Sequence, residues 1–121
     1  MKPVLQVALD FPDLHRALKA AEEALKGGAD WLEAGTPLIK SEGLNAVREL
    51  RKRFPGVKLA ADMKTVDTGA LEVEMAAKAG ANIVIILGSS DDSTVREAVE
   101  AGRRYGAEIM VDLIGCERPL E

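Results

Sequence analysis

The sequence predicts an α/β protein built from successive parallel β/α units, and two observations support this. Gly28, Gly80 and Gly106 each end a helical pattern and precede an apolar run, at a spacing of about 26 residues or twice that. Short apolar runs alternate with longer segments of helical periodicity along the whole chain. This order implies right-handed crossovers and a parallel sheet covered by helices. The connections are short and contain no Pro/Ser-rich linker, so we expect a single α/β domain over residues 1–121.

Each expected strand is a short apolar run that ends in polar residues or glycine. In chain order, these runs are Val4–Asp10, Trp31–Gly35, Lys58–Lys64, Ile83–Gly88 and Ile109–Ile114.

Each expected helix has an apolar face and a charged face. In the first of them, Leu14, Leu18 and Leu25 share one face, while Arg16 and Lys19 lie on the other. A glycine follows the helix, because glycine adopts the positive φ of a helix end at the lowest cost. The expected helices are Asp13–Lys26, Ser41–Phe54, Thr68–Ala79 and Asp91–Tyr105.

Two architectures accommodate this alternation. Five strands suit an open, flavodoxin-like sheet with helices on both faces. The same units also suit the first five of a (β/α)₈ TIM barrel, which would form a five-stranded half-barrel. Periodicity does not distinguish the two, so both remain open from the sequence.

Composition excludes several classes of function. Hydrophobic residues make up 47% of the chain and charged residues 30%, which is typical of a soluble globular protein. The net charge of −4 leaves no basic face, so we expect no nucleic-acid partner. The longest apolar run, Ile83–Leu87, is far shorter than the roughly 20 residues that span a bilayer. We therefore expect no membrane partner and a cytoplasmic location. Cys116 is the single cysteine, which argues against an internal disulfide.

Charged residues lie at the carboxyl ends of several expected strands. Asp10, Glu33, Asp62 and Lys64 each follow apolar residues, and Asp112 repeats the pattern on the last strand. These ends meet at one edge of a parallel sheet, where α/β proteins bind ligands. Buried charges need a partner, so we expect them to contact each other, a metal or a ligand. For Asp10, and for Asp67 beyond the third strand, the alternative is an ordinary helix N-cap.

Two of these carboxylates suit a hard cation. Glu33 and Asp62 would be neighbours across paired strands, and Mg²⁺ prefers oxygen ligands while keeping several waters. Lys64 follows Asp62 on the same face and would place a positive charge near any oxyanion formed there. This set favours enediolate chemistry, in which negative charge develops on a sugar carbonyl oxygen.

Three stretches resemble a known family. Residues Asp62 to Asp67 (DMKTVD) resemble the D-x-K-x-x-D motif of the orotidine 5′-monophosphate decarboxylase suprafamily. Leu5 to Asp10 (LQVALD) and Glu33 to Ile39 (EAGTPLI) are similar to the 3-hexulose-6-phosphate synthases, with the related 3-keto-L-gulonate-6-phosphate decarboxylases behind them. Asp67 to Gly69 (DTG) and Val111 to Gly115 (VDLIG) agree with the synthases, so the resemblance covers the whole chain.

The resemblance implies a set of roles. It assigns Glu33 and Asp62 to Mg²⁺, and Asp10 and Lys64 to the substrate site. Asp67 would enter the site of the neighbouring subunit in a homodimer, and Asp112 matches the acid at the end of the family's fifth strand. The implied reaction is a lyase's reversible aldol addition of formaldehyde to the phosphosugar ribulose 5-phosphate.

The sequence departs from the family pattern at its end. The family continues through three further strands that bring a catalytic histidine, an arginine and glycine-rich phosphate loops, whereas this sequence stops at Glu121. The only histidine, His15, lies in the first helical pattern, where we expect a solvated side chain. We therefore expect a protein fragment with the first five β/α units of the family, with feeble or absent turnover. The alternative function is an engineered barrel-fragment scaffold with no catalytic role.

Overall fold

A computed structural model describes residues 1–120 and contains a parallel sheet of five strands in the order β1-β2-β3-β4-β5. The strands are β1 (Gln6–Leu9), β2 (Trp31–Ala34), β3 (Lys58–Thr65), β4 (Ile83–Leu87) and β5 (Glu108–Asp112). The helices are α1 (Leu14–Lys26), α2 (Thr36–Glu42), α3 (Asn45–Arg53), α4 (Gly69–Ala79) and α5 (Asp92–Tyr105). None of these helices is both long enough and apolar enough to cross a membrane.

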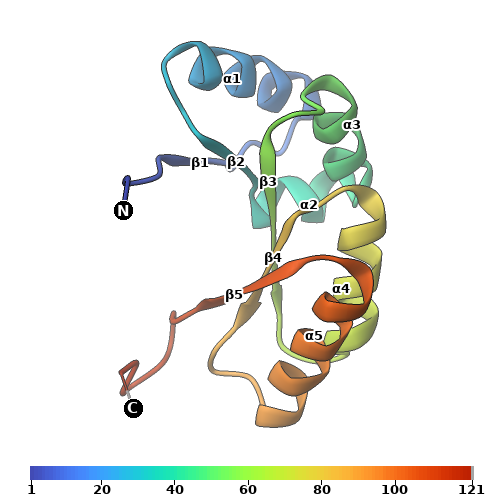
Figure 1. Ribbon diagram of the computed structural model, residues 1–121. Helices are drawn as coiled ribbons and strands as arrows, with labels where there is room; N and C mark the ends of the chain where they lie inside the picture. The colour runs from blue at the N-terminus through green and yellow to red at the C-terminus, as the bar shows by residue number, and fades with distance from the viewer. Residues whose placement is uncertain (121) are drawn as a thin grey trace.

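The strand order decides between the two expected architectures. A flavodoxin-like sheet reverses direction after its first crossover, which places the second strand at an edge. Here every strand pairs with the next one along the chain, so successive right-handed crossovers leave all the helices on one side of a curved sheet. Figure 1 shows this arrangement, with both termini on the side away from the helices. The parallel β/α prediction is confirmed as a half-barrel, and the flavodoxin-like alternative is excluded.

The segment after β2 differs from the prediction of one helix over Ser41–Phe54, which is wrong. Helix α2 begins at Thr36, because Gly35 takes an extended N-cap conformation and Pro37 lies in the first turn, where its missing N–H costs nothing. Gly43, with φ of 68°, ends α2, and α3 begins two residues later. Gly43 therefore separates two helices in a segment where hydrophobic periodicity alone predicts one.

The predicted last strand also runs too far, since β5 ends at Asp112 rather than Ile114. The Asp112 side chain accepts a hydrogen bond from the backbone N–H of Ile114 at 2.9 Å. This local bond is that of an Asx turn, which closes the strand. The other elements agree with their expected ranges to within a few residues at each end.

The main core lies between the sheet and its helices. Seven strand side chains that point to this side are fully buried, namely Leu9, Leu32, Ala34, Leu59, Ala61, Val84 and Ile86. Small helix residues, among them Ala17, Ala46 and Ala98, lie against them and allow the helices to approach closely. Helices α4 and α5 approach closely at Gly69, where a Cβ atom would lie 2.4 Å from the carbonyl oxygen of Thr94. Helix α4 therefore packs on α5 with no room for a side chain at that point.

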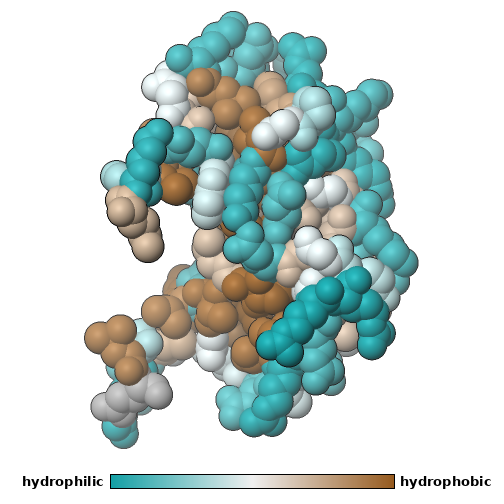
Figure 2. Space-filling model, viewed as in Figure 1, coloured by the Kyte–Doolittle hydropathy of each residue, from teal (hydrophilic) through white to brown (hydrophobic). Residues whose placement is uncertain are grey.

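The opposite face of the sheet carries a second, smaller cluster. Ala60, Ile83 and Ile85 are buried there, and Trp31 and Met110 pack against them. Figure 2 shows hydrophobic side chains gathered where β4 and β5 cross the middle of the view. Because strand side chains alternate between faces, the charged residues at the strand ends lie on this inner face, beyond the small apolar cluster.

Candidate active site

The site begins with an irregularity in β3. Asp62 is in register with Ile85 of β4, but Thr65 is in register with the very next residue, Ile86. Met63 and Lys64 therefore form a bulge, and Lys64 has a φ of 44°, which is uncommon for a residue with a side chain. Such bulges redirect a side chain, and this one brings the Lys64 ammonium group back to the carboxylate of Asp62.

Lys64 connects two strands through ion pairs. Its Nζ lies 3.2 Å from Oδ2 of Asp62 and also donates to Oδ2 of Asp112 on β5. The hydrogen bond to Asp112 and the neighbouring charge of Asp62 raise the pKa of Lys64. The same Lys64 bond, with the backbone N–H of Ile114, lowers the pKa of Asp112. The lysine is therefore a fixed cation at neutral pH, held between the carboxyl groups of Asp62 and Asp112.

Glu33 on β2 lies beside Asp62 and Lys64. It is in register with Ala60, so Asp62 follows two residues farther along the neighbouring strand on the same face. The side-chain amide of Gln6 donates from Nε2 to Glu33 Oε2 at 2.5 Å. Burial raises the pKa of Glu33, the charges of Asp62 and Asp10 act in the same direction, and the Gln6 bond opposes them. Negative charge is thus concentrated at this point of the inner face.

The residues fit a divalent cation that takes two protein ligands. Asp62 is only 8% exposed, and its buried Oδ1 has no hydrogen-bond partner. A buried carboxylate oxygen without a partner is costly, and a cation shared with Glu33 would satisfy it. Within residues 1–120 no three acidic, histidine or cysteine side chains are grouped closely enough to hold a metal. Water or substrate would supply the remaining ligands, as Mg²⁺ sites commonly allow.

The remaining two predicted residues lie farther from this centre. Asp10 is exposed beside β2, where its Oδ1 would be 1.9 Å from a Cβ atom at Gly35, so only glycine leaves space for it. It does not cap α1, since Asp13 does so by accepting from the N–H of Arg16. Asp67 is exposed in the loop before α4, and its carboxylate accepts from the N–H of Thr68. Glu33, Asp62 and Lys64 thus come together, Asp10 lies at their margin, and Asp67 takes no part in the Lys64 ion pairs.

Gln6 is the site residue that sequence reasoning missed. Alternation predicts that its side chain shares the inner face with Ala8 and Asp10, but the contact with Glu33 depends on the pairing of β1 with β2. The available signal was a polar amide in an otherwise apolar strand. A shallow pocket runs along part of the site and is lined by Gln6, Glu33, Asp62, Ile85, Met110, Val111, Asp112 and Leu113.

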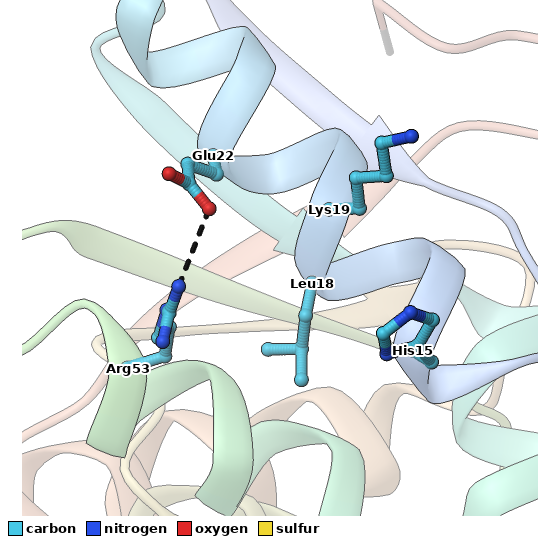
Figure 3. Close-up of a pocket in the computed structure, with 5 residues that line it drawn as sticks. All are labelled: His15, Leu18, Lys19, Glu22 and Arg53. Atoms are coloured by element: carbon cyan, nitrogen blue, oxygen red, sulfur yellow. Dashed lines mark hydrogen bonds and ion pairs between the residues drawn. The ribbon is translucent and has the colours of Figure 1, made fainter.

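A second pocket lies on the helical side of the molecule, away from these residues. It lies between α1 and α3, where Glu22 and Arg53 form an ion pair at 3.3 Å (Figure 3). His15 and Lys19 from α1 also line it. His15 is exposed, as the sequence predicts. The groove contains none of the residues at the strand ends, so the candidate site is the inner-face pocket.

Residues 3–121 match the Orotidine 5'-phosphate decarboxylase / HUMPS family. The chain belongs to this family. It is 45% identical over 113 residues to the 3-hexulose-6-phosphate synthase of Mycobacterium gastri. The aligned residues cover 93% of this chain and 54% of that protein. For the 3-hexulose-6-phosphate synthase of Bacillus subtilis (strain 168) the identity is 40%, with 93% and 53% covered. The resemblance drawn from the DMKTVD motif is thereby confirmed.

Solved structures agree. A crystal structure of 3-hexulose-6-phosphate synthase superposes with a TM-score of 0.92 at 45% identity, covering 95% of this chain and 55% of that one. The 3-keto-L-gulonate-6-phosphate decarboxylase of Vibrio cholerae O1 biovar El Tor str. N16961 gives a TM-score of 0.88 at 33% identity, with 92% and 51% covered. The chain therefore spans about half the length of the relatives it matches.

Proposed function

We propose that the inner-face pocket is the metal and oxyanion side of a lyase site that joins formaldehyde to ribulose 5-phosphate. The observation that carries the proposal is the fixed Lys64 cation beside the buried, partnerless Oδ1 of Asp62. Relatives at 45% and 40% identity that are named 3-hexulose-6-phosphate synthase support this choice of reaction. The activity belongs to the whole family fold, of which these residues would supply one part.

Glu33 and Asp62 would hold Mg²⁺ in this proposal. When bound, the metal supplies a Lewis acid that favours negative charge on a substrate oxygen. Lys64 supplies a second positive charge at the same end of the strands, held in place by Asp62 and Asp112 before any substrate arrives. Such preorganised charge costs no rearrangement during the reaction. Asp10 would line the substrate site from the edge strand β1, where Gly35 leaves room for its carboxylate.

A homodimer is part of the same proposal, with Asp67 reaching the site of the second subunit. Asp67 is exposed and follows Val66, which is also exposed. Leu71 and Met75, one helical turn apart on the following helix α4, are exposed apolar side chains as well. Exposed apolar side chains beside an exposed carboxylate are a suitable contact surface for a second copy. Contact between two copies through this surface would allow the Asp67 side chain to reach the site of the second subunit.

The test is formaldehyde-dependent consumption of ribulose 5-phosphate with Mg²⁺ present. We would assay the chain alone and mixed with the C-terminal half of the Mycobacterium gastri relative. We expect turnover in the mixture, its loss in Asp62→Ala, and its retention in Asp92→Ala, which removes an exposed carboxylate on α5. A mixture that forms a folded complex without turnover would reject the catalytic proposal and favour the scaffold alternative.

A further inference from the structure

Gln6 makes a contact that the proposed roles of the carboxylates leave unexplained. It lies on β1, the first strand of the sheet, in register with Trp31, while Ala8 is in register with Glu33. Its side chain therefore extends along the sheet by two residues to donate from Nε2 to Glu33 Oε2. The bond is partly buried and joins residues that are 27 positions apart in the chain.

The hydrogen bond from Gln6 favours the charged form of Glu33 in a place where neighbouring negative charges disfavour it. Glu33 is partly buried, and both Asp62 and Asp10 lie near enough for their charges to act on it. A glutamate side chain has several rotatable bonds, so like-charge repulsion would turn its carboxylate away from Asp62. The Gln6 amide fixes the carboxylate through Oε2, and Oε1 would then be the oxygen offered to a cation shared with Asp62. No charged group is needed for this, and an ammonium group in the same place would compete with a cation.

We propose that Gln6 is a positioning residue that orients the Glu33 carboxylate for a divalent cation shared with Asp62. The inference rests on the proposed function, because it takes Glu33 and Asp62 as the metal ligands. Residues that hydrogen-bond to a metal ligand fix its orientation, and their loss commonly weakens metal affinity by about 10- to 100-fold. The backbone of Gln6 pairs with β2 through main-chain groups, so the side chain can be changed without removing that pairing.

The experiment measures Mn²⁺ binding to the purified 121-residue chain by electron paramagnetic resonance of the free ion. Mn²⁺ accepts the same carboxylate and water ligands as Mg²⁺ and is visible in this assay. Gln6→Leu removes the donor while keeping a side chain of similar size. Gln6→Asn keeps the amide but withdraws it by one methylene, so it tests position rather than polarity. We expect both variants to bind Mn²⁺ about 10- to 100-fold more weakly.

Glu108→Gln is the matched control. It removes a carboxylate at the opposite end of the strands, where Glu108 pairs with Lys58, and we expect no change in Mn²⁺ affinity. Thermal unfolding of each variant without metal separates a positioning effect from a loss of fold. If Gln6→Leu unfolds, Gln6→Asn carries the test. Weak binding in a variant whose unfolding midpoint is unchanged is the result expected of a positioning residue.

The two ways of failing are distinguishable. If Glu33→Ala and Asp62→Ala abolish Mn²⁺ binding while both Gln6 variants bind as tightly as the parent chain, the role of Gln6 is refuted and the metal assignment stands. If Gln6→Asn binds as tightly as the parent and only Gln6→Leu is weak, polarity rather than position matters, and the inference is also overturned. If the carboxylate variants or the parent chain show no specific binding, the metal assignment itself fails, and the role of Gln6 fails with it.

Discussion

Replacing Lys64 with methionine tests the charge arrangement at the centre of the site. The change keeps an unbranched stem of the same length as far as Cε and removes the ammonium group from two carboxylates at once. The three side chains are partly shielded from solvent, at 34% exposure for Lys64, 11% for Asp62 and 25% for Asp112. Fully exposed ion pairs are worth about 0.2–1 kcal/mol, whereas removing one member of a buried pair costs roughly 3–5 kcal/mol. The expected loss lies between these, at about 2 kcal/mol.

The pKa shifts of Asp112 and Lys64 determine how the expected loss of stability changes with pH. The lowered pKa of Asp112 means that its stabilisation is complete above its unfolded pKa of about 3.9 and is lost as pH falls through the lower folded value. The raised pKa of Lys64 means that its contribution is complete below its unfolded pKa of about 10.4 and is lost as pH rises through the higher folded value. The difference between parent and Lys64→Met should therefore be largest from about pH 5 to pH 9 and should shrink toward pH 3.

Urea unfolding in the presence of EDTA measures the free energy at each pH. At pH 7 a loss of about 2 kcal/mol corresponds to a fall in Tm of roughly 6–10 °C for a chain of this size. Lys78→Met is the matched control, because Lys78 forms an exposed pair with Glu74 one turn away on α4, and its loss should leave the stability close to that of the parent. A Lys64→Met chain as stable as the parent at pH 7, or equally destabilised at pH 3, would refute the reasoning.

Three further substitutions test the backbone, two of them near the site and one at the opposite end of the strands. Thr68→Gly should stabilise the chain by up to about 1 kcal/mol in urea unfolding, because Thr68 is exposed with a φ of 53°; a loss of stability would contradict this. Gly35→Ala should displace the carboxylate of Asp10 and cost about 1–3 kcal/mol, since the new Cβ would lie 1.9 Å from Oδ1; an unchanged Tm would show that the loop adapts freely. Arg51→Met should cost about 3 kcal/mol, because the guanidinium donates to four main-chain carbonyl oxygens around the start of β3 and β4; a Tm within about 2 °C of the parent would disprove the role.

Local features of the sequence determined most of the elements and the family. The β/α alternation follows from hydrophobic periodicity, which neighbouring residues set among themselves. The DMKTVD motif brings Asp62 and Lys64 together over three residues, so their proximity needed little knowledge of the fold. The helix boundary within Ser41–Phe54 was not predicted, because a glycine within an amphipathic pattern does not by itself indicate the positive φ that Gly43 adopts.

Tertiary structure decided everything that depends on which strands are neighbours. The same alternation is compatible with two strand orders, and only the packing of each helix against the next strand selects the sequential one. That order places Asp112 of β5 against Lys64 of β3 and Gln6 of β1 against Glu33 of β2. The bulge at Lys64 likewise arises from the register of β3 with β4. These contacts join residues 27 to 48 positions apart, a separation at which local periodicity carries no information about distance.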